Sequence, residues 1–155
     1  MTDNEHARHL GGLLANLQSL EFLLRGFLSQ LPSARPFGLP NGTDIYSFPV
    51  GAQLPENDFT SYDSLDQLLE KFNSAMRADD KAEIGGSLIK LRDALAHGRI
   101  SAEKENKTLR LIKFSRPKDG RVLVTFNELM TDAWFKEQNG QVINAIQYIH
   151  SQLKP

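Results

Sequence analysis

The sequence predicts a mainly α-helical fold: a bundle of four helices with a β-hairpin, at about 108–126, inserted between the third and the fourth helix. Apolar residues recur at three- and four-residue spacing in four separate stretches, and this is the period of an amphipathic helix. Between the third and the fourth stretch lie two β-rich runs, joined by a turn that contains Pro117 and Asp119-Gly120. These two patterns together indicate a helical bundle with a small β insertion.

The chain has the length and composition of one globular domain. Its 155 residues, 40% hydrophobic and 24% charged, suffice for one core but not for two independent cores. The absence of cysteine excludes structural disulfides, thiolate zinc sites and cysteine nucleophiles. The polar N-terminus does not resemble a signal peptide, and no apolar run approaches the roughly 20 residues that span a bilayer. We therefore expect a single cytoplasmic domain, 1–155, that does not associate with a membrane.

The first helix is expected from about Asp3 to Leu31, and its apolar face is broad. The face consists of Leu10, Leu13, Leu14, Leu17, Leu20, Leu24, Phe27, Leu28 and Leu31, with Phe22 and Leu23 beside it. Such a face can pack on a second copy of the chain as well as on its own domain. A central helix buried by its own neighbours explains the pattern equally well.

A loop rich in proline and glycine is expected at 32–61. It contains five of the seven prolines, namely Pro32, Pro36, Pro40, Pro49 and Pro55. An irregular segment of this length is unusual in a compact domain. Ile45 to Phe48 could form a short strand within it, and Phe37, Phe48 and Phe59 could hold the loop against the helices. The loop could cover a site or only the core.

The second and third helices are expected to form a short antiparallel pair. The second begins after Ser61 or Asp63, and its apolar face is Leu65, Leu68, Leu69, Phe72 and Met76. The third spans about Lys81 to His97, and its apolar face is Ile84, Leu88, Leu91 and Leu95. Gly98 is expected to end the third helix in a left-handed conformation, which glycine adopts without a steric penalty.

The fourth helix is expected after the hairpin. Asn127 can cap its N-terminus, because a side-chain oxygen at that position accepts a hydrogen bond from a free backbone N–H. Its apolar positions are Leu129, Trp134, Phe135, Val142, Ile143, Ile146, Ile149 and Leu153. Gly140 is expected to bend or split this region.

The charge of the chain is unevenly distributed. From Lys90 to Arg121, ten basic residues stand against four acidic ones, a local charge of +6; since the net charge is −1, the rest carries −7. Lysine and arginine supply most of the affinity of proteins for phosphate backbones. The candidate RNA-binding residues are therefore Arg99, Arg110, Lys113, Arg116, Lys118 and Arg121. A solvated hairpin with basic residues along its edges accounts for the same charges.

One motif in this basic segment could carry chemistry: Arg92 and His97, five residues apart near the end of the third helix. Asp93 and His97 are four residues apart on one helical face, so the carboxylate could orient the imidazole and stabilise its protonated form. The alternative is an ordinary helix end, because a histidine in the last turn interacts favourably with the helix dipole.

The segment Arg92-Asp93-Ala94-Leu95-Ala96-His97 resembles the R-polar-x-x-x-H motif of the HEPN superfamily (higher eukaryotes and prokaryotes nucleotide-binding domains). The resemblance implies a helical bundle with the motif late in its third core helix, and a homodimer in which two motifs form one composite site. Many members are metal-independent ribonucleases of toxin–antitoxin, phage-defence and RNA-processing systems. A regulatory protein such as a cognate antitoxin is therefore a possible partner.

The resemblance also implies a mechanism. His97 would act as general base or acid at the ribose 2′-hydroxyl or the leaving 5′-oxygen. Arg92 would stabilise negative charge on the phosphoryl oxygens, and Asp93 would orient His97. RNA would then be cleaved without a metal or another cofactor, and the product would end in a 2′,3′-cyclic phosphate.

Two alternatives to the enzyme remain open. The same fold could be a non-catalytic module that binds a nucleotide, RNA or a protein in the same groove. It could also be a small interaction protein with no nucleotide site, whose basic hairpin would point away from the motif. A metal site at His6 and His9, which share a helical face, lacks an evident third ligand, so no metal is predicted.

Overall fold

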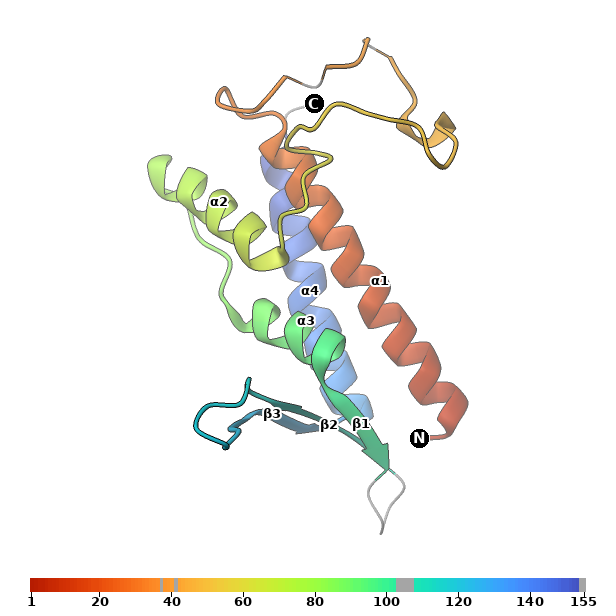
Figure 1. The fold of residues 1–155 in the computed structure, drawn as a ribbon. Helices are drawn as coiled ribbons and strands as arrows, with labels where there is room; N and C mark the ends of the chain where they lie inside the picture. The colour runs from red at the N-terminus through yellow and green to blue at the C-terminus, as the bar shows by residue number, and fades with distance from the viewer. Residues whose placement is uncertain (37, 41, 103–107, 154–155) are drawn as a thin grey trace. The chain divides into compact units, whose positions relative to one another are not determined.

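The computed structural model describes residues 1–36, 38–40, 42–102 and 108–153, and in these residues it has four α-helices and a three-stranded antiparallel sheet (Figure 1). The helices are α1 (Asp3–Leu28), α2 (Leu65–Ala78), α3 (Ser87–His97) and α4 (Asp132–Gln152). The strands β1 (Arg99–Ala102), β2 (Leu109–Phe114) and β3 (Val124–Leu129) all lie between α3 and α4 in the chain. This confirms a mainly α fold with a β insertion before the last helix.

The chain forms two compact units. One comprises Met1–Leu20 and Ile84–Tyr148, and therefore contains α3, the sheet and most of α4. The other comprises Glu21–Glu83 and Ile149–Pro155, and contains α2 with the end of α1. The candidate motif belongs to the first unit, and the Pro- and Gly-rich loop belongs to the second.

The core of the unit that contains the sheet comes from three helices and the sheet. Its buried side chains include Leu13, Leu17, Leu20, Leu88, Leu91, Ala94, Leu111, Met130, Trp134, Phe135, Val142 and Ala145. A part-buried amide pair adds a polar contact, because Asn16 Nδ2 donates to Asn139 Oδ1 at 2.9 Å. The predicted face of α1 is narrower than expected, since Leu14 is exposed.

In the other unit, α2 has the predicted apolar face. Leu65, Leu68, Leu69, Phe72 and Met76 are all buried, and the Phe72 ring packs edge-on against Phe27 of α1 at 4.9 Å. The helix begins with a capping box: Ser64 Oγ accepts from Gln67 N–H, and Gln67 Oε1 accepts from Ser64 N–H.

In its described residues, 32–36, 38–40 and 42–61, the loop is irregular, as predicted, apart from one 3₁₀ turn. That turn, η1 (Ile45–Ser47), replaces the expected strand, because Asp44 Oδ1 accepts the Tyr46 N–H at 2.9 Å and so closes a local turn. Of the three phenylalanines expected to hold the loop, Phe59 packs edge-on against Phe22 at 5.3 Å. Phe48 is exposed, and Phe37 lies outside the described residues.

The predicted hairpin is present but is part of a larger sheet with the order β1-β2-β3. Its turn has the expected Asp-Gly chemistry: Asp119 and Gly120 both have positive φ, 51° and 70°. The strand β1 was missed, because four residues are too few for a recognisable alternation.

Two predictions about where helices begin are wrong. Asn127 does not cap α4 but pairs with Ile112 inside β3, and Thr131 Oγ1 accepts the Trp134 N–H instead. The third helix begins at Ser87 rather than Lys81, because Gly85 and Gly86 lose more backbone freedom than other residues on becoming helical.

The fourth helix also differs from the prediction. It continues through Gly140, with no break assigned within Asp132–Gln152. A single glycine lowers helix propensity without blocking the backbone hydrogen bonds, so tertiary packing can keep the helix intact. Nowhere in the described chain is a helix both long and apolar enough to cross a bilayer.

Candidate functional site

The Arg92–His97 motif occupies the end of α3, at the point where the helix meets the sheet. Figure 1 shows the chain passing from α3 directly into β1, with no intervening loop. Gly98 makes this passage possible. Its N–H donates to Ala94 O at 2.7 Å, which closes the last turn of the helix.

Gly98 is required for close packing and not for a left-handed conformation. Its φ of −77° and ψ of 178° are extended, so the predicted left-handed helix end is wrong. A Cβ at this position would clash with Ala94 O, lie 2.7 Å from Leu111 Cδ1 and lie 3.1 Å from Ile112 O. The glycine therefore lets the end of α3 approach β2, and this sets the position of His97 beside the sheet.

An aspartate shared by a lysine and a histidine lies at this junction. Lys113 Nζ, on β2, is 2.5 Å from Asp93 Oδ2, and His97 Nε2 is 3.9 Å from Asp93 Oδ1. The lysine distance is that of a charge-assisted hydrogen bond, whereas the histidine distance is too long for one. Asp93 is therefore held mainly by Lys113, and it acts on His97 as a nearby negative charge.

The three side chains differ in how much of their surface is exposed to solvent. The relative exposed area is 67% for His97, 45% for Asp93 and 19% for Lys113. His97 thus offers its imidazole to solvent, as a group that reacts with a large substrate must. Lys113, expected to contact RNA, is instead largely covered and paired with Asp93.

Arg92 is half-buried on α3. It lies five residues before His97, which corresponds to about 140° around the helix axis. The two side chains of one chain therefore leave α3 in different directions. A site that uses both must form around the end of the helix or receive one of them from a second copy.

Two further predicted cations share the other face of the sheet. In the register, Arg99 pairs with Ile112, and Ser101 pairs with Arg110, so these side chains lie opposite to the face of Lys113. The Arg99 guanidinium lies 5.5 Å from the centre of the Phe114 ring, a cation–π contact. Arg110 Nη1 donates to Asn127 Oδ1 at 2.9 Å. The sheet therefore divides the predicted RNA-binding residues between its two faces.

The remaining predicted cations, Arg116, Lys118 and Arg121, are exposed around the β2–β3 turn. The turn is closed by two backbone hydrogen bonds between Lys118 and Arg121, of 2.8 and 2.9 Å. The turn thus places these three cations in solvent rather than in the α3–β2 junction.

The N-terminal histidines pack against α4. The His9 ring stacks on Phe135 at 5.2 Å, and His6, which is buried, meets the same ring edge-on at 6.2 Å. Neither ring nitrogen of His6 has a hydrogen-bond partner among the residues that the structure describes. Among the described residues, no three histidine, aspartate or glutamate side chains cluster as metal ligands would.

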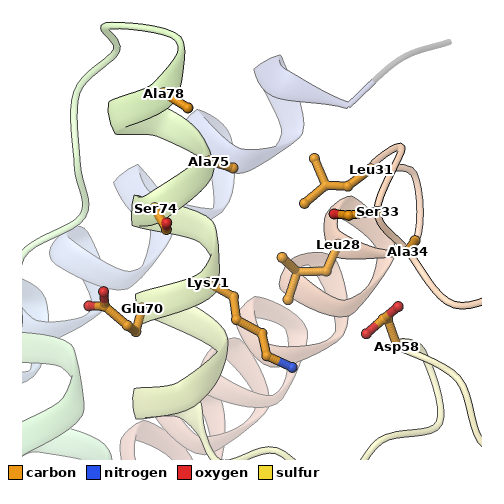
Figure 2. A pocket seen from close by; sticks show the side chains of 10 residues that line it. All are labelled: Leu28, Leu31, Ser33, Ala34, Asp58, Glu70, Lys71, Ser74, Ala75 and Ala78. Atoms are coloured by element: carbon orange, nitrogen blue, oxygen red, sulfur yellow. The ribbon is translucent and has the colours of Figure 1, made fainter.

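A separate cavity of about 590 Å³ lies in the unit that contains α2 (Figure 2). Its described lining is Leu28, Leu31, Ser33, Ala34, Asp58, Glu70, Lys71, Ser74, Ala75 and Ala78. The charged groups at its edge already have partners: Lys71 Nζ lies 2.7 Å from Asp63 Oδ2, and Asp58 Oδ2 accepts the Arg35 N–H at 2.6 Å. The Lys71 hydrogen bond is the main cause that lowers the pKa of the Asp63 carboxyl.

The sequence did not reveal that Lys113 pairs with Asp93. It also did not reveal that Phe114 contacts Arg99 or that Asn127 accepts a hydrogen bond from Arg110. The alternation of β2 carries part of this information: Arg110, Ile112 and Phe114 occupy every second position, so they share one face, and Lys113 faces the other way. The partner of each side chain depends on the register, which the pattern of a single strand does not contain.

Comparisons with models of known protein families, with characterised proteins and with solved structures give no match to this chain.

Proposed function

We propose that the protein is a HEPN-like, metal-independent endoribonuclease that acts as a homodimer. The observation that carries the proposal is the exposed imidazole of His97, on the last turn of α3 beside a basic sheet, with Arg92 five residues earlier on the same helix. A histidine with access to solvent can exchange protons at neutral pH. An arginine can bind two phosphoryl oxygens at once.

In this proposal a neutral His97 removes the proton of a ribose 2′-hydroxyl. The 2′-oxygen forms a bond to phosphorus while the bond from phosphorus to the 5′-oxygen breaks, and an acid protonates the departing 5′-oxygen. Arg92 stabilises the charge that grows on the non-bridging oxygens. The product is a 2′,3′-cyclic phosphate and a free 5′-hydroxyl.

The angle between Arg92 and His97 around α3 supports the homodimer of this proposal. The reaction needs a base and an acid on opposite sides of the phosphate. The motif of one chain contains a single histidine, His97, which can fill only one of these two roles at a time. Two copies with their α3 ends adjacent bring two His97 and two Arg92 side chains to one phosphate. The wide angle between Arg92 and His97 around α3 suits a site that combines residues of both copies.

The test is RNA cleavage in the presence of EDTA by the wild type, His97→Ala and Arg92→Ala. Each variant should lose at least about 100-fold in rate, the lower end of what general acid–base catalysis contributes. His150→Ala and Lys90→Ala, at exposed positions on α4 and α3, are the matched controls and should cleave like the wild type. RNA binding without cleavage would instead favour a non-catalytic binding module in the same fold.

A further inference from the structure

Among the described residues, the strand β3 is an edge of the sheet, because the order β1-β2-β3 gives it one strand neighbour. Met130 N–H donates to Leu109 O, and Ser115 N–H donates to Leu123 O, so these are the hydrogen-bonded positions. Val124 and Asn127, which lie on either side of a register shift, therefore direct their N–H and C=O groups away from β2, whereas Leu129 O already accepts the Thr131 N–H at 2.9 Å.

A run of aliphatic side chains leads into this edge and is unusually exposed. The relative exposed area is 49% for Val122, 71% for Leu123 and 56% for Val124. Edge strands usually avoid such residues, because an unpaired apolar edge recruits other strands. Three in succession mark a surface that favours a protein partner over water.

The turn that precedes this run is cationic. Arg116, Lys118 and Arg121 are exposed, and none forms an ion pair within the part of the chain that the structure describes. Asp119 is the only acidic residue from 116 to 121, so this segment carries a charge of +2. A partner that approaches the edge meets uncompensated positive charge at this end.

The other end of β3 has a different character. A groove of about 420 Å³ lies beside it, lined by Arg110, Asn127, Glu128, Leu129, Thr131, Ala133, Trp134 and Glu137. Its two glutamates outnumber Arg110, whose Nη1 already donates to Asn127 Oδ1, so the groove disfavours an acidic side chain. The two ends of the edge therefore differ in charge preference: acidic groups are accepted next to the turn and disfavoured at the groove.

We infer that this edge, from Val122 to Leu129, binds an extended segment of a partner protein as an added strand. The segment alternates aliphatic residues with others and carries its acidic side chains next to the turn of Arg116, Lys118 and Arg121. Backbone hydrogen bonds to the free edge supply affinity, and the aliphatic run and the groove supply selectivity. RNA offers no partner for the row of backbone groups and gains little from aliphatic side chains, so a peptide fits this edge better.

The experiment uses the full chain labelled with ¹⁵N and a capped nine-residue peptide in which valine alternates with glutamate in one half and with threonine in the other. Its binding should shift the amide resonances of 122–129 and should weaken about tenfold in the variant Arg116→Glu, Lys118→Glu, Arg121→Glu. Lys136→Glu, at an exposed position on α4, is the control and should bind like the wild type. The same peptide with every backbone nitrogen methylated should not bind, because it lacks the donors for a ladder.

Three results would overturn the inference. The first is the absence of shifts at 122–129 at millimolar peptide, or unchanged binding of the N-methylated peptide. The second is self-association of the protein that Leu123→Lys abolishes, since a second copy would then occupy the edge. The third is a single-stranded RNA that displaces the peptide and shifts the same resonances. None of these measurements depends on RNA cleavage, so the inference and the proposed function fail separately.

Discussion

Lys113 Nζ lies 2.5 Å from Asp93 Oδ2, and this ion pair joins the middle strand of the sheet to the end of α3. It fixes the carboxylate whose second oxygen faces His97 at 3.9 Å. The proposed catalytic histidine is thus placed by a lysine that, in the sequence, looks like one more member of a basic stretch.

The pair should contribute measurably to stability. Lys113→Met leaves the part-exposed Asp93 without its cation, and we expect the free energy of unfolding to fall by about 1 kcal/mol or less. Urea denaturation of the two single variants and of the double variant Lys113→Met, Asp93→Asn should give a coupling energy that stabilises the folded state. Equal effects of Lys113→Met and of the exposed control Lys90→Met would contradict a specific pair.

Gly98→Ala should destabilise the junction of α3 and β2. The added Cβ would overlap Ala94 O and crowd Leu111 Cδ1, so we expect a loss of about 1–3 kcal/mol in the free energy of unfolding. Gly140→Ala is the opposite control. A Cβ there meets nothing within 4 Å, and alanine favours the helix by about 0.5–1 kcal/mol. Thermal denaturation should therefore move in opposite directions for the two variants.

The stability of the unit that contains α2 should depend on pH through Asp63. The hydrogen bond from Lys71, followed by one from Ser61, lowers the pKa of the Asp63 carboxyl below its ordinary value, against the effect of burial. Since the folded pKa is the lower one, the stabilisation is complete above the unfolded pKa and is lost as pH falls through the folded pKa. Asp63→Asn should therefore cost most near neutral pH, and the gap to the wild type should narrow in acid. A gap in unfolding free energy that stays constant from pH 7 to pH 3 would refute this.

If the proposed reaction is correct, the ribose 2′-hydroxyl is the nucleophile. RNA with a 2′-deoxy substitution at the cleaved nucleotide should bind with similar affinity and remain intact. Mass spectrometry of the wild-type products should find a 2′,3′-cyclic phosphate and a 5′-hydroxyl. A 5′-phosphate among the products would point to attack by water and would remove His97 from the proposed role.

Much of the fold could be predicted from local patterns. The face of α2 from Leu65 to Met76 is buried as its spacing indicates, and the Asp119-Gly120 turn has the two positive φ angles that such a pair favours. Both depend on residues close in sequence, and for such residues helical period and turn chemistry are sufficient.

The errors arose where distant segments compete with local preference. Asn127 has the character of a helix cap, but pairing with Ile112 keeps it in β3. Gly98 resembles a helix end in the left-handed conformation, but the approach of Leu111 requires an extended residue without a side chain. In each case tertiary contacts override a local preference worth only about 1 kcal/mol.

The sequence by itself determined the periodicity of the helices, the turn of the hairpin and the presence of Arg92, Asp93 and His97 on one helix. These follow from spacing, because each helical residue advances by about 100°. The tertiary structure decided that Asp93 pairs with Lys113, that His97 stays exposed and that β3 has one strand neighbour among the described residues. Those relationships depend on the register of β2 against its neighbours, and register is set when the strands and α3 pack together.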